Sequence, residues 1–166
     1  MKLFSLHSYS SRKATRRTLP VILAGFLILS ASVAVGQRDR FADVTIKTIP
    51  VNGTVSMLIG SGGNIGVSAG DDGILIIDDQ FAPLAGRIKA AIAKLGSDKP
   101  QFVLNTHIHG DHTGGNAEFG ADSLIVAHKN VRSRMQSNSA PAVALPVVTF
   151  EDRLSIHFNG EDIDVI

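Results

Sequence analysis

Residues 102–116 read FVLNTHIHGDHTGGN, a short apolar run followed at once by three histidines and one aspartate within six positions. The run 102–105 has the length and composition of a buried strand. In α/β proteins, residues that bind ligands gather in loops at the ends of such strands. The stretch therefore predicts an α/β domain with a functional loop directly after one of its central strands.

The four polar side chains of this loop are of the types that bind metal ions. Residues i and i+2 of an extended segment point to the same side, so His107 and His109 can converge on one cation. Asp111 and His112 follow Gly110, where the chain can turn, and they can face a second point close by. Imidazole and carboxylate ligands suit Zn²⁺, and also Fe or Mn. The alternative, a histidine-rich surface loop, explains poorly why four potential ligands follow a buried strand.

Apolar segments of strand length surround this loop, and one clear helix interrupts them. Asp71-Asp72-Gly73 is a turn signal between two β-prone runs, so 64–69 and 74–78 are predicted to pair as a hairpin. Apolar residues at three- and four-residue spacing predict a helix over 83–95. Antiparallel-looking pairs and a crossover helix favour a layered α/β domain with a mixed sheet. The other predicted elements are a first strand within 37–50, with 44–46 as its β-prone part, strands at 55–59, 123–127, 154–158 and 163–166, and a short helix at 130–135.

The histidine loop and its surroundings resemble the metallo-β-lactamase superfamily. Thr-His-Ile-His-Gly-Asp-His, residues 106–112, is similar to the H-x-H-x-D-H signature of that family, and Thr113-Gly114-Gly115-Asn116 after it also agrees. Upstream, Asp78 ends a strand just before a helix, as does the family's acidic residue that braces the metal loop by hydrogen bonding. Asp79 is the second candidate for this role. An ordinary carboxylate at a helix start is the alternative for Asp78.

The resemblance implies a metallo-β-lactamase-like αβ/βα sandwich of two similar halves, with one or two metal ions at the edge between them. The ions would be Zn²⁺, with Fe or Mn as alternatives. His107 and His109 would bind the first ion, and Asp111 and His112 the second. Further ligands in the family come from later in the chain. The remaining histidines of the exported part, His128 and His157, are excluded as ligands, because the family gives them no metal role.

This set of residues predicts a hydrolase. A zinc ion with an open position lowers the pKa of bound water to about 7, and the hydroxide then attacks an ester, amide or lactam-type bond of a small molecule. Asp111 would be the catalytic residue that orients the nucleophile and accepts its proton. One alternative is a non-catalytic metal-binding remnant of such an enzyme. Another is a redox di-iron relative, against which His109 argues, because that branch carries glutamate there.

The first 36 residues have the pattern of a secretory signal peptide. Five basic residues and no acid precede an apolar and small-residue run at 19–36. An uncleaved membrane anchor is the alternative, which Pro20 and the Ser and Gly content weaken. Arg16-Arg17 also resembles a twin-arginine export signal. We therefore expect cleavage, no stable membrane anchor and a periplasmic or secreted protein.

The net charge of the chain changes sign without this leader. Residues 37–166 carry 11 basic and 15 acidic residues, a net charge of −4. A small-molecule substrate is therefore expected, and a nucleic-acid partner is not. We expect 37–166 to be the N-terminal part of a metallo-β-lactamase-like domain, because the chain ends inside an apolar β run. On this interpretation a missing C-terminal half completes the metal site, and the chain alone is catalytically defective and poorly soluble.

Overall fold

A computed structural model describes residues 40–166 of the chain. The predicted signal peptide at 1–36 lies outside the described residues, and residues 37–166 form a unit of their own by their contacts. Among the helices of the described part, none is both long enough and apolar enough to cross a membrane.

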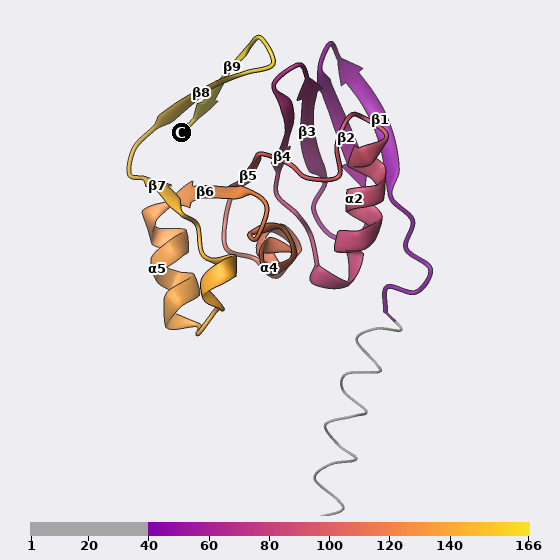
Figure 1. Ribbon diagram of the computed structural model, residues 1–166. Helices are drawn as coiled ribbons and strands as arrows, with labels where there is room; N and C mark the ends of the chain where they lie inside the picture. The colour runs from indigo at the N-terminus through magenta and orange to yellow at the C-terminus, as the bar shows by residue number, and fades with distance from the viewer. Residues whose placement is uncertain (1–39) are drawn as a thin grey trace, which may run out of the picture. The chain divides into compact units, whose positions relative to one another are not determined.

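Seven strands within residues 40–166 form one sheet, in which their spatial order is their order in the chain (Figure 1). They are β1 (Lys47–Asn52), β2 (Val55–Ile59), β3 (Ile65–Gly70), β4 (Gly73–Ile77), β5 (Phe102–Asn105), β6 (Leu124–His128) and β7 (Val148–Phe150). Strands β1 to β4 pair antiparallel and β4 to β7 pair parallel, so the predicted mixed sheet and the β3–β4 hairpin are confirmed. The direction changes at β4 because helix α2 (Ala85–Ala93) carries the chain back before β5 begins.

Helix α2 covers one face of this sheet because its apolar residues fall on one side. Leu84, at its start, and Ile88 and Ile92 within it are fully buried at four-residue spacing. They belong to the same core cluster as Ile76 of β4 and Val103 of β5. This packing places β4 and β5, and therefore the ends of both strands, in the centre of the domain.

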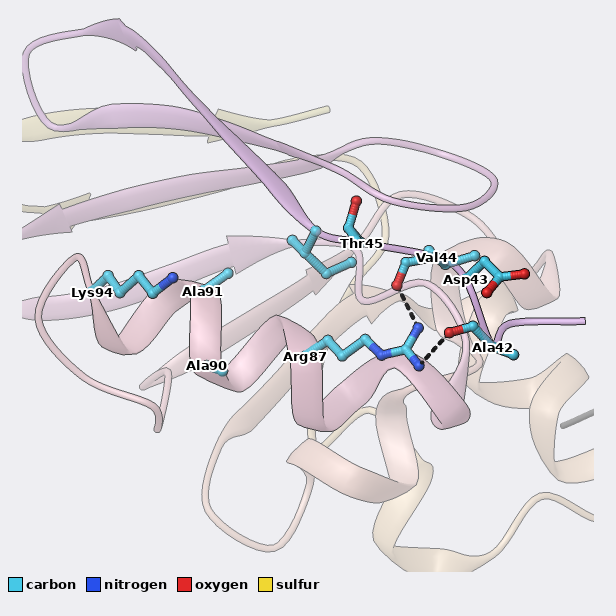
Figure 2. Close-up of a pocket in the computed structure, with 9 residues that line it drawn as sticks. Ala42, Asp43, Val44, Thr45, Arg87, Ala90, Ala91 and Lys94 are labelled. Atoms are coloured by element: carbon cyan, nitrogen blue, oxygen red, sulfur yellow. Dashed lines mark hydrogen bonds between the residues drawn. The ribbon is translucent and has the colours of Figure 1, made fainter. Parts of the chain in front are cut away.

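The outer side of α2 holds the chain segment that precedes β1. The Arg87 guanidinium donates to the carbonyl oxygen of Ala42 at 3.0 Å, and also to that of Val44 (Figure 2). The first strand, predicted within 37–50, begins at Lys47, so its β-prone residues 44–46 precede it and do not belong to it.

A hairpin of two strands, β8 (Leu154–Phe158) and β9 (Glu161–Val165), contacts the opposite face of the sheet. Phe158 is buried there with Leu75 of β4, whereas the neighbouring Ile76 faces the core under α2. Both faces of β4 are thus covered, which explains its unbroken apolar sequence. The pairing of β8 with β9 confirms the predicted hairpin.

Several short elements differ from the sequence-based prediction. The predicted helix at 83–95 begins as a 3₁₀ turn, η1 (Ala82–Leu84), because Pro83 occupies its first turn and α2 follows only afterwards. Strand β7 and the four-residue helices were not predicted, because so few residues carry no periodic pattern. The remaining helical elements are α3 (Gly110–Thr113), α4 (Asn116–Phe119), α5 (Lys129–Ser137), which contains the predicted helix at 130–135, and η2 (Ala142–Ala144).

Candidate metal centre

The predicted metal loop lies where two parallel strands end side by side. Strand β4 ends at Ile77 and its parallel neighbour β5 ends at Asn105, so Asp78 and the histidine loop emerge at the same edge of the sheet. Asp78 has a φ of +64°, in the left-handed region that non-glycine residues rarely adopt. Helix α3 then turns the loop so that His112 returns to Asp78.

The carboxylate of Asp78 contacts the loop at both of its ends. Thr106 donates to it twice, from its backbone N–H to Oδ1 at 2.8 Å and from its hydroxyl to Oδ2 at 2.8 Å. Nδ1 of His112 lies 2.7 Å from the same Oδ2. An imidazole whose Nδ1–H donates to a carboxylate presents Nε2 as a metal ligand. These side-chain contacts are made by Asp78, while Asp79 contacts a different part of the chain.

The four predicted ligands lie in two pairs. Nε2 of His107 is 3.1 Å from Nδ1 of His109, and Nε2 of His112 is 3.4 Å from Oδ2 of Asp111. Two ligands at about 2.0–2.2 Å from a tetrahedral zinc ion are about 3.3–3.6 Å apart. The second pair has this spacing, and the first is slightly closer. The two pairs coincide with the pairings expected from the sequence, and metal binding by them stays a prediction.

The two pairs adjoin each other without merging into one larger ligand set. The ring of His107 lies 3.9 Å from that of His112, measured between centroids, and 4.7 Å from that of His109. Within residues 40–166, no group of three or more His, Asp or Glu side chains is placed to hold one metal ion. The described residues therefore supply two donors to each candidate ion, fewer than the three of a typical hydrolytic zinc site.

The carboxyl of Asp111 has a lowered pKa. Burial raises the pKa of its carboxyl, but a hydrogen bond from its own backbone N–H, the nearby His112, the backbone N–H of Gly63 and His109 together outweigh burial and lower the pKa. The ionised form is the one that binds cations and accepts protons. The surroundings of Asp111 therefore favour the form that both predicted roles require.

Two buried asparagines support the metal loop, and the sequence analysis did not single them out. The amides of Asn105 and Asn116 bond to each other in both directions, at 3.0 and 2.9 Å. Asn105 also donates to the carbonyl of His112 at 3.2 Å, and Asn116 to that of Ala144 at 2.9 Å. The only sequence signal for them was their position, directly after β5 and directly after the loop. An asparagine directly beside a buried strand or loop is expected to be buried, and a buried side-chain amide needs hydrogen-bond partners.

Asp79 supports the turn that follows His112. Its backbone N–H donates to the carbonyl of His112 at 3.1 Å, and its Oδ1 accepts the backbone N–H of Gly115 at 2.8 Å. Its Oδ2 is buried and has no hydrogen-bond partner among the described residues. Burial raises the pKa of Asp79 well above its usual range, helped by the neighbouring Asp78 and opposed by the Gly115 N–H.

The two histidines that were excluded as ligands serve other contacts. His128 precedes α5, where its Nδ1 accepts the backbone N–H of Asn130 at 3.1 Å, and its Nε2 lies 2.7 Å from the carbonyl oxygen of Glu151. The side chain of His157 is 78% exposed and pairs with Asp162 across the β8–β9 hairpin. Neither side chain contacts a ring of the metal loop.

A serine motif in the sequence does not form a second catalytic site. No G-x-S-x-G motif was expected in the chain, but residues 66–70 read G-V-S-A-G and match it. In a serine hydrolase the central serine lies on a sharp turn between a strand and a helix. Here Ser68 lies within β3, paired on both sides, and accepts a hydrogen bond from Asn159 at 3.0 Å.

A groove of about 870 Å³ lies next to the histidines. Thr106, His107 and Ile108 of the metal loop line one part of it. Apolar side chains of other elements, among them Val131 and Phe150, line another. This volume is in the range of small-molecule sites, and its lining joins apolar side chains to one candidate ligand, His107.

Comparisons with known proteins agree with this geometry. Residues 49–134, which include the whole histidine loop, match the family model of the metallo-beta-lactamase superfamily. No curated protein matches the chain.

Solved structures share the fold at low sequence identity. A metallo-beta-lactamase from Pontibacter korlensis is 17% identical with a TM-score of 0.59, over 74% of this chain and 60% of that one. A metallo-beta-lactamase from Cronobacter sakazakii with a HARLDQ motif is 20% identical with a TM-score of 0.60, over 75% and 53%. The metallo-beta-lactamase MIM-1 from Novosphingobium pentaromativorans is 24% identical with a TM-score of 0.57, over 66% and 46%. The chain thus spans about half the length of these structures, and the similarity confirms the predicted fold class.

Proposed function

The chain belongs to the metallo-beta-lactamase superfamily, a family of metal-dependent hydrolases, and from this premise we propose that it is a zinc-dependent hydrolase of small molecules. The bond that it cleaves is an ester, amide or lactam-type bond. One observation carries the proposal: the loop after β5 holds two donor pairs, His112 with Asp111 at 3.4 Å, which is the spacing of two zinc ligands, and His107 with His109 at 3.1 Å, which is slightly closer.

In this proposal each residue of the loop has a defined task. His107 and His109 hold one ion, and His112 and Asp111 hold a second. Asp78 accepts the Nδ1–H of His112 and thereby keeps Nε2 of that ring directed toward the ion. Asp111, in its ionised form, orients a water molecule and accepts its proton on a carboxylate oxygen. A bound zinc ion would lower the pKa of that water and polarise the bond that is cleaved.

The groove beside His107 and the charge of the domain support a small-molecule substrate. The groove has the size of a small-molecule site and mostly apolar walls. The net charge of −4 of residues 37–166 does not favour binding to nucleic acid. The basic and apolar pattern of residues 1–36 supports a periplasmic or secreted protein without a stable anchor.

A second candidate function is a metal-binding protein without catalysis. It is favoured by the number of ligands, because the described residues offer two donors to each ion and hydrolytic zinc sites use three. The two candidates make the same prediction for metal binding and opposite predictions for turnover.

The test measures zinc binding and hydrolysis on the same preparation of the full chain. Zinc affinity is determined by competition with a chromogenic chelator, and hydrolysis with p-nitrophenyl acetate and a chromogenic β-lactam. We expect His107→Ala and Asp111→Ala to lower zinc affinity at least 10-fold and to remove turnover. His157→Ala is the matched control and should change neither, because this histidine is exposed and lies outside the loop.

The outcomes separate the two candidates. Zinc binding that depends on His107 and Asp111, together with turnover, supports the hydrolase. The same binding without turnover of any substrate supports the non-catalytic candidate. A wild-type chain that binds no zinc overturns both.

A further inference from the structure

A glycine-rich loop between β2 and β3 packs directly on the candidate metal loop. Residues 60–63 read Gly-Ser-Gly-Gly, and the backbone N–H of Gly63 donates to Oδ2 of Asp111 at 3.1 Å. A Cβ atom on Gly62 would lie 2.5 Å from the Cβ of Asp111, and one on Gly63 would lie 2.5 Å from Cε1 of His112. Contacts this close leave no room for side chains. The backbone of this loop therefore forms the wall beside both predicted ligands of the second ion.

Gln80 anchors this loop through both ends of its side-chain amide. Its Nε2 donates to the carbonyl oxygen of Gly63 at 2.5 Å, and its Oε1 accepts the backbone N–H of Ser61 at 3.2 Å. The side chain is fully buried, and its backbone has a φ of +55°. A left-handed backbone and a buried amide are both unfavourable unless the surroundings require them. Here they bring the amide to the loop that touches Asp111.

The segment after β4 therefore contacts both loops that border Asp111. Asp78 bonds to the histidine loop on one side, and Gln80 bonds to residues 60–63 on the other. The Gln80 side chain does not touch Asp111, so it can act on that carboxylate only through Gly63. Gln80 can therefore affect the site without contacting an ion or a substrate.

We infer that Gln80 is a positioning residue of the candidate metal site, which fixes the orientation of the Asp111 carboxylate through the backbone N–H of Gly63. The inference rests on the proposed function, in which Asp111 is a metal ligand. A carboxylate oxygen has two lone pairs, so Oδ2 accepts the Gly63 N–H and keeps a lone pair for a cation. Outer hydrogen bonds of this kind orient metal ligands, and losing one lowers metal affinity about 10–100-fold.

The test compares Gln80→Met with Gln101→Met in the full chain. Methionine has nearly the length of glutamine but makes neither of the two hydrogen bonds. Gln101 also accepts a backbone N–H with its Oε1, that of Ile74 at 2.8 Å, but at the opposite end of β4. Gln101→Met therefore controls for the loss of one glutamine–backbone hydrogen bond away from the site.

Cobalt(II) replaces zinc in this experiment because its visible absorption reports both affinity and ligand geometry. We expect Gln80→Met to lower Co²⁺ affinity at least 10-fold and to change the shape of the absorption bands. Gln101→Met should stay within about twofold of the wild type in affinity. Wild-type affinity and bands in Gln80→Met overturn the inference.

A measurement without metal separates this inference from the proposed function. In the metal-free chain, the amide of Gly63 should exchange its hydrogen at least 10-fold faster in Gln80→Met than in Gln101→Met, as followed by NMR. An unchanged exchange rate overturns the inference whatever the metal affinity. Failure of the wild type to bind Co²⁺ overturns the proposed function, and the exchange rates still decide whether Gln80 holds the loop. If Gln80→Met does not fold, Gln80→Asn, whose shorter amide cannot reach both partners, takes its place with the same expected direction.

Discussion

The two ends of strand β4 place their polar groups differently. At the carboxyl end, Asp78, Asp79 and Gln80 are all buried, and Asp78 and Gln80 have left-handed backbones. At the amino end, Asp72 is exposed, and it exchanges hydrogen bonds with Asn159 at the tip of the β8–β9 hairpin, at 2.9 and 2.6 Å. Burying a polar group is unfavourable unless every partner is in place. The buried polar side chains therefore lie at the carboxyl end of β4, beside the candidate ligands. The amino end of β4 has exposed hydrogen bonds, which water can replace.

Among the changes at the two ends of β4, Asp78→Ala is expected to lower stability most. It leaves the backbone N–H and hydroxyl of Thr106 and Nδ1 of His112 without their shared acceptor. We expect the free energy of unfolding to fall by about 3 kcal/mol, because three hydrogen bonds to one buried carboxylate are lost at once and their partly buried donors are left without an acceptor. Urea unfolding of the metal-free chain at pH 7 measures this loss. A decrease below about 1 kcal/mol would mean that the polar contacts at the carboxyl end of β4 contribute no more to stability than those at the amino end.

Asp79→Asn is expected to have an intermediate effect with a distinct pH dependence. The amide oxygen of asparagine still accepts the Gly115 N–H, but the side chain cannot ionise. The pKa of Asp79 is raised in the folded state by burial, so the folded wild type holds this proton at pH values where the unfolded chain has lost it. The wild type therefore loses stability as the pH rises from about 4 toward the folded-state pKa, and the variant does not.

The measurement is urea unfolding of both proteins between pH 4 and pH 8. The stability of Asp79→Asn relative to the wild type should increase with pH as the pH rises toward the folded-state pKa of Asp79, and then level off. A difference that stays constant across this range would contradict a raised pKa for Asp79.

Asp72→Ala, at the amino end of β4, is expected to change stability least. It removes an exposed acceptor from the Asn159 backbone N–H, and water can replace it. We expect at most about 0.5 kcal/mol of lost stability and no change in zinc affinity. Thermal unfolding and the zinc competition assay provide both numbers. A loss as large as that of Asp78→Ala would show that the two ends do not differ energetically.

Local patterns in the sequence were sufficient for the central strands and for the metal loop. The unbroken apolar run of β4 and the turn at 71–73 predicted a buried strand in a hairpin, and both are present. The two-residue spacing of His107 and His109 predicted that their side chains lie close together, and their nearest ring nitrogens are 3.1 Å apart. Features set by nearest neighbours in the chain were therefore predictable from the residues themselves.

Features that depend on distant parts of the chain were not predictable in this way. The segment before the first strand is held by Arg87, more than 40 positions away, which binds the carbonyl of Val44. The role of Gln80 depends on residues 60–63 folding back onto it. Neither contact is marked by a periodic pattern in the sequence. A single glutamine that will be buried cannot be told from an exposed one by its sequence alone.

The order of the strands bears on how this domain assembles. Because β1 to β7 lie in the sheet in the order in which they occur in the chain, each new strand pairs with the one made just before it. The loops closed by these pairings are short for the hairpins and longer only where a helix intervenes, so the entropy lost at each closure is modest. A sheet of this topology can grow strand by strand from its first hairpin, whereas the contact of Asp72 with Asn159 must wait until the β8–β9 hairpin has formed.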